Sequence, residues 1–324
     1  MPELLRRGLL ALAASIPGLA VAQRARWPNR PLRLIVPFQP GAAPDLLARA
    51  YAPRLAELLG QPVLIENRAG ASGLVGTEVA ARAPADGYTL LLANASVLAI
   101  SPAIRTNLPY DPIGSFDPVA LVGTDDSALV VRADSPFRRA TDVLAAAKAW
   151  PDGLSYSSGG IGSSTHMAAE FLQQMVGVDL LHVPYRGSPQ ALAGMLTGQV
   201  DMTFTTMNAA MAAVRGRAAR ALATTGATRD PLLPDVPTFA ELGFPAYEAS
   251  GWLGFVVPAG TPPDIVGELA GAIRQVAAQP GTARRVASLG IKPILSTPAA
   301  FRAILPPEIA RWSEVARQAG VQLE

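Results

Sequence analysis

The chain of 324 residues has no cysteine and only two histidines, His166 and His182. No disulfide can therefore hold the fold, and both thiolate zinc sites and thiol catalysis are excluded. Two histidines are also too few for a multi-histidine metal centre. We accordingly expect no metal site.

Charged residues are scarce as well, at 16% of the chain, and lysine occurs only at Lys148 and Lys292. A net charge of only +2 argues against a nucleic-acid binder, which normally carries clustered basic side chains. Half of the residues are hydrophobic, which is typical of an ordered chain with sizeable cores. The length predicts two domains.

Motifs that bind or hydrolyse nucleotides are missing too. The sequence contains neither the phosphate-binding pattern G-x-x-x-x-G-K-[ST] nor the serine-hydrolase pattern G-x-S-x-G. The segment Gly70–Gly76 has the spacing G-x-x-G-x-x-G and follows the polar residues Glu66–Arg68, whereas a dinucleotide loop has G-x-G-x-x-G directly after a strand. We therefore expect no nucleotide and no other cofactor.

The one long apolar run lies at the N-terminus. Arg6 and Arg7 precede the apolar segment Gly8–Leu19, and Ala20-Val-Ala22 forms an A-x-A cleavage site. This order predicts a signal peptide at residues 1–22 and hence a periplasmic protein. The alternative is a membrane anchor, for which the segment is short.

After this segment, strand-type and helix-type stretches alternate, which predicts an α/β fold with parallel strands covered by helices on both faces. Strands are expected at Leu32–Pro37, Pro62–Glu66, Tyr88–Ala93, Asp117–Val122, Ala128–Val131, Leu154–Ser157, Leu180–Val183, Val200–Phe204, Ala219–Thr225 and Trp252–Val257. Helices are expected at Asp45–Leu59, Gly76–Arg82, Thr141–Ala149, Thr165–Val176, Ser188–Thr197, Ala209–Val214, Pro263–Ala278, Ala283–Leu289 and Pro298–Gln318. The pattern begins a second series after residue 124 and returns near residue 248, which predicts one lobe of residues 23–124 and 249–324 and another of residues 125–248.

Two loops share one design, about 120 residues apart. Leu32–Asp45 and Leu154–His166 each run from a strand into a glycine-bearing turn and then into a helix. A helix start offers unpaired N–H groups and a partial positive charge, so it can receive an anion without Lys or Arg. Two such loops, one from each lobe, would hold the two ends of a small carboxylate.

Each loop also has a simpler structural explanation. Gly41 permits a close ligand approach, and Asp45 caps the helix or orients the loop; the alternative is an ordinary strand–helix turn. In the second loop, the hydroxyls of Ser163, Ser164 and Thr165 either bind a carboxylate or only cap the helix.

Further candidates come from neighbouring turns. Tyr185 could close over a ligand, and the adjacent Arg186 could pair with a carboxylate or with Asp201. The alternative is a surface turn with a solvated arginine, and this explanation applies better to Arg186 than to Tyr185. A general-base role for His166 needs a nucleophile and an orienting acid, which the spacing does not supply. We therefore expect no catalytic residue.

Seven segments together resemble the tripartite tricarboxylate transporter receptor family, the Bug family of periplasmic solute-binding proteins. They run in family order over nearly the whole chain after the signal peptide: Trp27–Phe38, Gly60–Arg68, Pro84–Leu90, Leu108–Pro112, Gly162–His166, Val183–Gly187 and Gly198–Asp201.

The resemblance implies a two-lobed type II periplasmic binding-protein fold with a ligand cleft between the lobes. It also implies a small carboxylate ligand, bound by loop amides, hydroxyls and waters, and a membrane permease as partner of a monomeric receptor. The ligand-binding residues expected in the cleft are Phe38, Gln39, Gly41, Ala42, Ala43, Asp45, Asn94, Ser96, Gly160, Ser163, Ser164, Thr165, Tyr185 and Asp201.

The first loop departs from the family pattern. The family usually has Gly-Gly, a small residue and then Thr or Ser before the Asp, whereas this chain has Gly41-Ala-Ala-Pro-Asp45. Ala42 would restrict the backbone, and Pro44 removes a hydroxyl and an N–H donor. The loop therefore favours a ligand that needs fewer hydrogen-bond donors at that end, such as a monocarboxylate with an apolar body. The alternative is that waters replace the missing donors.

The sequence thus predicts a solute-binding receptor that is not an enzyme. Two alternatives use the same cleft: a hydrolase or isomerase working with His166 and Asp201, and a sensor whose closed form is read by a signalling protein.

Overall fold

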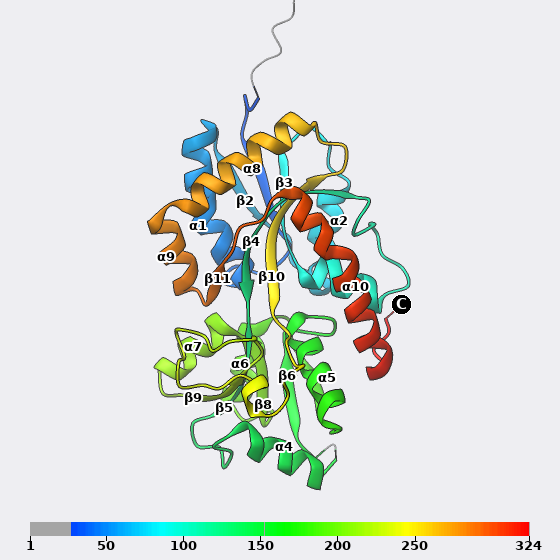
Figure 1. Ribbon diagram of the computed structural model, residues 1–324, viewed down its shortest axis with the longest axis vertical. Coiled ribbons are helices and arrows are strands. Elements are labelled where there is room, and N and C mark those ends of the chain that lie inside the picture. The colour runs from blue at the N-terminus through cyan, green and yellow to red at the C-terminus, as the bar shows by residue number, and fades with distance from the viewer. Residues whose placement is uncertain (1–26, 152, 324) are drawn as a thin grey trace, which may run out of the picture.

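The computed structural model describes residues 27–151 and 153–323, so the predicted signal peptide lies outside the described residues. The chain forms two α/β lobes, one above the other in Figure 1, and each is built on its own sheet. We call the part with the six-stranded sheet lobe 1 and the part with the five-stranded sheet lobe 2. The prediction of a two-lobed α/β fold is confirmed.

The sheet of lobe 1 has the strand order β11-β4-β10-β3-β1-β2. Its strands are β1 (Leu32–Val36), β2 (Val63–Asn67), β3 (Thr89–Asn94), β4 (Phe116–Asp125), β10 (Gly251–Pro258) and β11 (Ile291–Pro293). As predicted, β1 pairs in parallel with β2 and β3. The sheet as a whole is mixed, because β10 returns from lobe 2 and enters antiparallel between β3 and β4.

Helices cover both faces of this sheet: α1 (Ala43–Leu59), α2 (Leu74–Ala81), α3 (Ser101–Ile104), α8 (Pro263–Ala278), α9 (Pro280–Ser288) and α10 (Pro298–Ala319). The alternation of β1 directs Leu34 to the core shared with α1, α8 and α9, and Ile35 to the core shared with α2 and α10. Two short segments, η1 (Ala71–Gly73) and the π-helical η2 (Ser96–Ile100), complete lobe 1.

The sheet of lobe 2 has the order β7-β6-β8-β5-β9, with β5 antiparallel to both neighbours. Its strands are β5 (Ser127–Arg132), β6 (Ser155–Ser158), β7 (Leu181–Pro184), β8 (Met202–Thr206) and β9 (Ala219–Thr224). Its helices are α4 (Ala140–Ala149), α5 (Ser164–Val176), α6 (Ser188–Leu196) and α7 (Met207–Arg215), with the short η3 (Ala240–Leu242).

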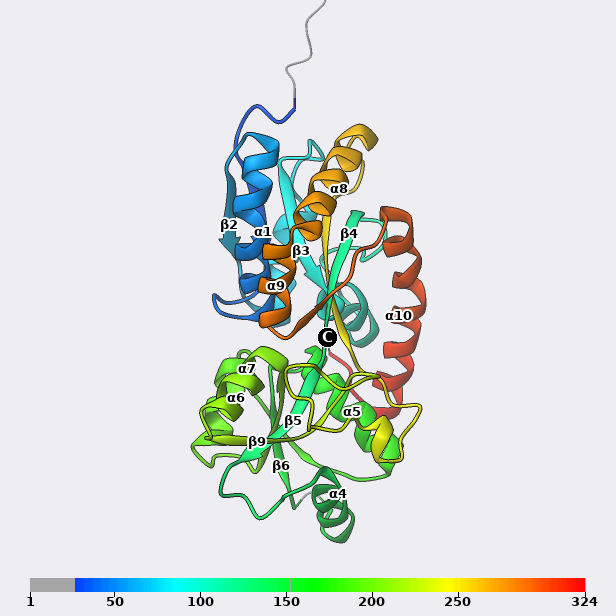
Figure 2. The ribbon, with the colours of Figure 1, turned by 60° about the vertical axis from the view of Figure 1, so that its left-hand side comes forward.

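Two extended crossings join the lobes. The chain passes from β4 into β5 at Asp126 and returns between β9 and β10. The buried carboxylate of Asp126 accepts hydrogen bonds from Ser250 Oγ at 2.7 Å and from Lys292 Nζ at 2.6 Å, so it ties both crossings to β11. Helix α10 also descends beside α5 (Figure 2), where Gln174 Nε2 donates to the carbonyl of Val315 at 2.6 Å.

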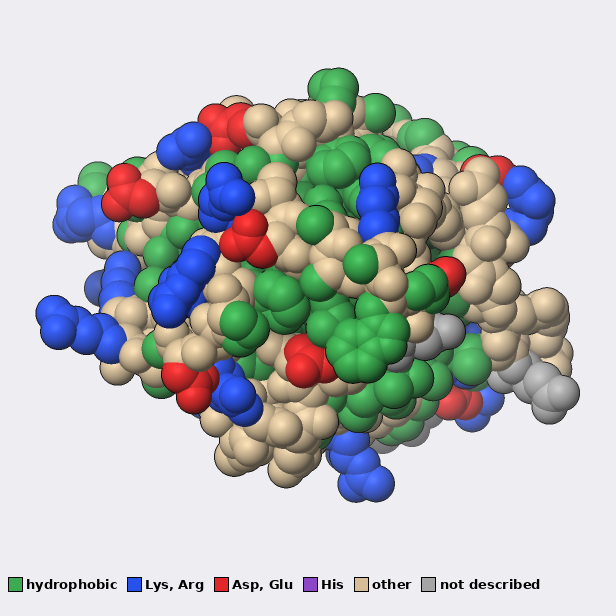
Figure 3. Space-filling model, turned by 90° about the horizontal axis from the view of Figure 1, so that it is seen from below, with side chains coloured by type: hydrophobic (Ala, Val, Ile, Leu, Met, Phe, Trp, Pro, Cys, Tyr) green, Lys and Arg blue, Asp and Glu red, His purple; other side chains and the backbone are tan. Residues whose placement is uncertain are grey.

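The far end of lobe 2 carries side chains of both charges around an apolar area (Figure 3). Trp150, just after α4, is the most exposed of the large hydrophobic residues in the described part of the chain, at 66%. No helix among residues 27–151 and 153–323 combines the length and apolarity that a membrane span requires.

Candidate ligand cleft

A cleft of about 620 Å³ lies between the lobes, where the loops that follow β1, β2, β6 and β7 meet. The carboxyl ends of the strands face it, as is usual for ligand sites in open α/β sheets. Five predicted site residues line the cleft: Phe38, Gln39, Ala42, Ser163 and Tyr185.

The wall formed by lobe 1 is mostly apolar. It consists of Pro37, Phe38, Gln39, Pro40, Ala42 and residues 69–73. Ala42 has φ −69° and ψ 157°, an ordinary extended conformation that an alanine adopts without strain. Pro44 is buried in the first turn of α1, where a proline fits without loss of a helical hydrogen bond.

A single buried carboxylate shapes the first loop. Asp45 is 1% exposed and accepts hydrogen bonds from the Gly41 amide, Arg49 Nε and Asn67 Nδ2, each at 2.9 Å. Asn67 Nδ2 also donates to the carbonyl of Phe38 at 3.0 Å. Burial acts to raise the pKa of Asp45, but these hydrogen bonds outweigh it and hold the pKa below its usual value. Asp45 therefore positions the loop, and both of its oxygens are already occupied.

The segment between β2 and α2 lines the same wall with residues 69–73. It contains the start of Gly70–Gly76, whose glycine spacing does not match a dinucleotide loop. Four successive residues have left-handed φ values: Gly70 (147°), Ala71 (46°), Ser72 (56°) and Gly73 (100°). A left-handed alanine or serine is costly by about 1–3 kcal/mol and persists only when the surroundings impose it. A Cβ on Gly73 would lie 2.6 Å from Val97 Cγ1. Gly73 therefore allows this segment to pack closely against η2 beside the cleft.

The wall formed by lobe 2 contains Gly159, Ser163, Tyr185, Arg186, Gly187 and Pro189. Ser163 caps α5 by accepting from the His166 amide at 3.2 Å, and its Oγ lies 3.0 Å from Thr165 Oγ1. Thr165 is 1% exposed and accepts from the Gly159 amide at 2.9 Å. If Thr165 donates to Ser163, the proton of Ser163 is free for a ligand, so Thr165 supports the loop from behind.

Glycines are required in the second loop for steric reasons. Gly160 has φ 116°, and a Cβ there would lie 2.9 Å from the carbonyl oxygen of Tyr185. Gly162 has φ 74°, and a Cβ there would lie 2.3 Å from Cδ1 of Ile104 in lobe 1. The second loop thus packs directly against the other lobe.

Two hydrogen bonds join the lobes at this place. Ser72 Oγ donates to the carbonyl of Ile161 at 2.9 Å, and the amide of Ser164 donates to Ser96 Oγ at 3.1 Å. Ser96 and Ser164, both expected to contact a ligand, contact each other in this structure. The start of α5 is therefore held by lobe 1.

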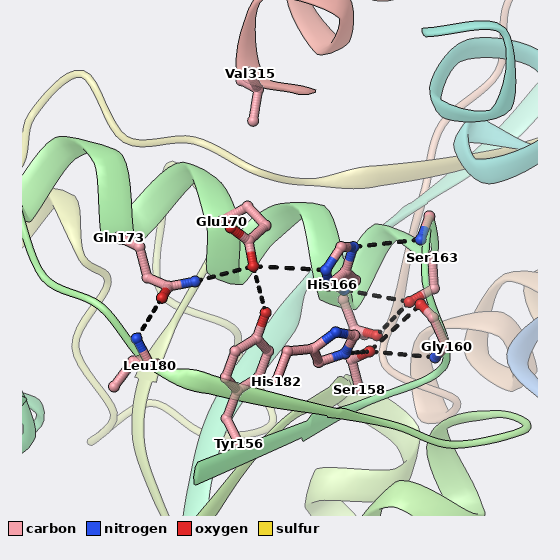
Figure 4. Close-up of polar contacts among 12 residues, drawn as sticks. Tyr156, Ser158, Gly160, Ser163, His166, Glu170, Gln173, Leu180, His182 and Val315 are labelled. Carbon is pink, nitrogen blue, oxygen red and sulfur yellow. Dashed lines mark hydrogen bonds and ion pairs between the residues drawn. The ribbon is translucent and has the colours of Figure 1, made fainter. Parts of the chain in front are cut away.

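A buried polar network lies behind the second loop (Figure 4). The carboxylate of Glu170 accepts from Tyr156 at 2.6 Å and lies 3.5 Å from His166 Nε2. The His166 and His182 rings stack at 4.1 Å, and His182 Nε2 lies 2.7 Å from Ser158 Oγ. Burial lowers the pKa of His166 to about 3 and that of His182 to about 4, so both rings are neutral at neutral pH.

This network supports the loop and does not form a hydrolytic centre. Ser158 is fully buried, and its Oγ accepts from the Gly160 amide at 3.2 Å, which leaves a substrate no access to it. His166 Nδ1 accepts from the Gly162 amide at 3.3 Å. The two histidines thus fix Gly160 and Gly162, which lie between the lining residues Gly159 and Ser163.

The remaining predicted site residues do not line the cleft. Gly41 is exposed and Ala43 is buried, one on each side of Ala42, and Asn94 Oδ1 accepts from the Val97 amide at 3.3 Å. Asp201 lies at the amino end of β8, where its carboxylate accepts from Ser155 N and Oγ, far along the strands from the cleft loops. His166 and Asp201 therefore sit at opposite ends of the lobe 2 sheet.

Arg186 lines the cleft, although the sequence favoured a solvated side chain for it over pairing with a carboxylate. The position of Arg186 in the turn after β7 could have indicated this role, because loops at the carboxyl ends of parallel strands form ligand sites. Tyr185 lines the cleft as expected, and its hydroxyl donates to Gln199 Oε1 at 2.8 Å.

A cleft between two α/β lobes, lined from both lobes by loops at the carboxyl ends of strands, is the architecture of a solute-binding protein. Residues 47–321 match the sequence model of the tripartite tricarboxylate transporter family receptor, and the chain belongs to that family. The resemblance drawn from the sequence is therefore confirmed. Members of the family are substrate-binding receptors of the periplasm.

Similar curated proteins cover nearly the whole chain. A UPF0065 protein in the tcbD-tcbE intergenic region of a Pseudomonas species is 37% identical, covering 94% of this chain and 91% of its own length. Protein BugT of Bordetella pertussis is 36% identical, covering 92% of each chain.

Solved structures agree with the fold. The periplasmic binding protein BugD is 32% identical with a TM-score of 0.85, covering 92% of this chain and all of its own. Rpa4515 of R. palustris, solved with adipate, is 33% identical with a TM-score of 0.87, covering 91% of this chain and 99% of its own. MatC of Rhodopseudomonas palustris, solved with malate, is 31% identical with a TM-score of 0.83, covering 89% and 99%.

Proposed function

We propose that this protein is a monomeric periplasmic receptor that captures a small organic carboxylate in the interlobe cleft and delivers it to a membrane permease. The observation that carries the proposal is the cleft, lined from both lobes by loops at the carboxyl ends of strands. The adipate and malate in two related structures support a carboxylate ligand.

Capture proceeds by hinge closure about the two crossings between the lobes. The ligand carboxylate lies against Ser163 and the glycine loop of lobe 2, where a hydroxyl and a helix start favour negative charge. The bonds of Ser72 to Ile161 and of Ser164 to Ser96 then hold the lobes together around it. A permease reads the closed form.

A thermal-shift screen tests the proposal with monocarboxylates, dicarboxylates, amino acids and aromatic acids. A ligand at 100 times its Kd is expected to raise the unfolding free energy by about 2.7 kcal/mol. The stabilising acid should also reduce the radius of gyration in small-angle X-ray scattering, since closure compacts the two lobes. A protein that no acid stabilises or compacts would contradict the proposal.

Export is part of the same proposal. The basic pair, apolar run and Ala20-Val-Ala22 site direct the chain to the periplasm, with cleavage after Ala22. Mass spectrometry of the periplasmic protein is expected to give Gln23 as its first residue. An intact Met1 on the soluble protein would be the contrary result.

The cleft serves binding without turnover. The enzyme alternative required His166 and Asp201 to act together, and Asp201 instead ties the start of β8 to Ser155. Incubation of the protein with its stabilising acid should return the acid unchanged by mass spectrometry, and His166→Ala should not alter that result.

A further inference from the structure

The two walls of the cleft differ in charge. Lobe 1 contributes mainly proline, alanine, glycine and Phe38, with Gln39 and Ser72 as its polar side chains. Ser72 already donates its hydroxyl proton to Ile161. Lobe 2 contributes Ser163, Tyr185 and Arg186, and Arg186 is the one charged side chain among the described lining residues.

The backbone holds Arg186 at this wall. On one side, the amide of Tyr185 donates to the carbonyl of Ser158 at 3.2 Å. The ring of Tyr185 packs over Gly194 so tightly that a Cβ there would lie 2.3 Å from its hydroxyl oxygen. On the other side, Gly187 has φ 125° and is the N-cap residue of α6.

The guanidinium of Arg186 is available to a ligand. Within residues 27–151 and 153–323 it makes no ion pair, and its expected partner Asp201 is occupied by Ser155. Three other arginines of lobe 2 do form ion pairs: Arg132 with Asp134, Arg139 with Asp142 and Arg229 with Glu241.

We propose that Arg186 determines specificity by pairing with the single carboxylate of the ligand, so that the cleft selects monocarboxylic acids whose apolar body rests on the wall of lobe 1. This rests on the proposed carboxylate-binding function and names the class of acid. It sets the chain apart from the two relatives solved with dicarboxylates.

Charge balance is the physical reason. One guanidinium can neutralise one carboxylate, and its planar fork matches the two oxygens. A second carboxylate would face Phe38, Pro40 and the alanines of lobe 1, where closure removes water without supplying a cation. A methyl or phenyl group at that place loses no hydrogen bond and gains apolar contact.

Calorimetry with three six-carbon probes tests the inference. Hexanoate, adipate and hexanamide share one chain length and differ in charge. The wild type is expected to bind hexanoate at least tenfold more tightly than adipate. Arg186→Gln should weaken hexanoate binding about tenfold, since the pair is partly open to solvent, and should leave hexanamide binding within twofold. Arg186→Gln should also remove most of the dependence of hexanoate affinity on the NaCl concentration.

Arg138→Gln is the matched control, because Arg138 is also exposed in lobe 2 but precedes α4 at the end away from the cleft (Figure 1). It should leave all three affinities unchanged. Equal losses for hexanoate and hexanamide in Arg186→Gln would overturn the charge-pairing role. A wild type that prefers adipate overturns the selectivity but leaves the proposed function intact. If neither acid binds and the wider acid screen also stabilises nothing, the proposed function is overturned as well.

Discussion

The two walls of the cleft come from loops of similar sequence design, yet different interactions hold them. In lobe 1, one ionised carboxylate, Asp45, binds the loop from behind. In lobe 2, neutral rings and hydroxyls bind the loop through His166, His182 and Thr165. The comparison shows that equal loop patterns do not imply equal chemistry, because the support behind a loop decides what it can offer to a ligand.

Acidification should produce the largest effect, and the loss of stability should come from the two histidines of lobe 2. Asp125 of β4, whose pKa is raised by burial to about 7, opposes this loss because it takes up a proton in the folded state. The pKa values of His166 and His182 lie at about 3 and about 4 in the folded state, below the unfolded value of 6.5. The unfolded state therefore binds more protons as pH falls below 6.5, and stability decreases. Between pH 6.5 and pH 5 the two histidines should together lower the unfolding free energy by about 3 kcal/mol.

Urea unfolding between pH 6.5 and pH 5 measures this loss of unfolding free energy. His182→Gln should make the unfolding free energy less dependent on pH. Hydrogen exchange at pH 5 should increase in the loop before α5 but not in the loop before α1. The reason is that the lowered pKa of Asp45 keeps its contribution to stability until pH falls below about 3.8, its ordinary value. Equal loosening of both loops would contradict the comparison.

Removing the carboxylate of Asp45 should loosen the loop of lobe 1 and leave the loop of lobe 2 unchanged. Asp45→Ala is expected to lower the unfolding free energy by about 2–3 kcal/mol at neutral pH, because it leaves the Gly41 amide and Asn67 without their acceptor. Hydrogen exchange should then increase in the lobe 1 loop only. Asp142→Ala serves as control, because this partly exposed carboxylate also accepts from two backbone amides; the substitution should lower the unfolding free energy by about 1 kcal/mol.

Within lobe 2, the two hydroxyls should separate into different roles. Ser163→Ala should weaken binding of the stabilising acid by roughly 1.5–3 kcal/mol, since Ser163 faces the cleft. Thr165→Ala should chiefly lower stability, since Thr165 is buried behind it. Calorimetry and urea unfolding on both variants distinguish these effects. Ligand affinity unchanged in both would mean that the hydroxyls only cap α5.

The smallest effect is expected from restoring the family pattern in lobe 1. Pro44→Thr with Ala42→Gly should improve dicarboxylate affinity relative to monocarboxylate affinity by a few-fold, because Ala42 lines the cleft and Pro44 is buried two residues further along, in the first turn of α1. Competition calorimetry with adipate and hexanoate measures the ratio. An unchanged ratio would mean that waters already supply the missing hydrogen bonds.

The sequence by itself determined most of the local structure. The predicted strand Leu32–Pro37 and helix Ser188–Thr197 match β1 and α6 within one residue at each end, because burial periodicity and glycine or proline boundaries act over a few residues. The π-helical turn Ser96–Ile100 and the short strand β11 were missed, since neither has a periodic pattern long enough to detect.

Only the tertiary structure decided which loops meet at the cleft. Phe38, Ala42 and Ser163 could be proposed from sequence, because each follows a strand that leads into a helix. Whether Gly70–Gly73 and Arg186 line the cleft depended on how the crossings set the two sheets against each other. Asp201 lies at the opposite end of the strands from the cleft. A sequence pattern reports how a segment folds over several residues, whereas the cleft is made by segments more than 80 residues apart, such as Ser72 and Ile161.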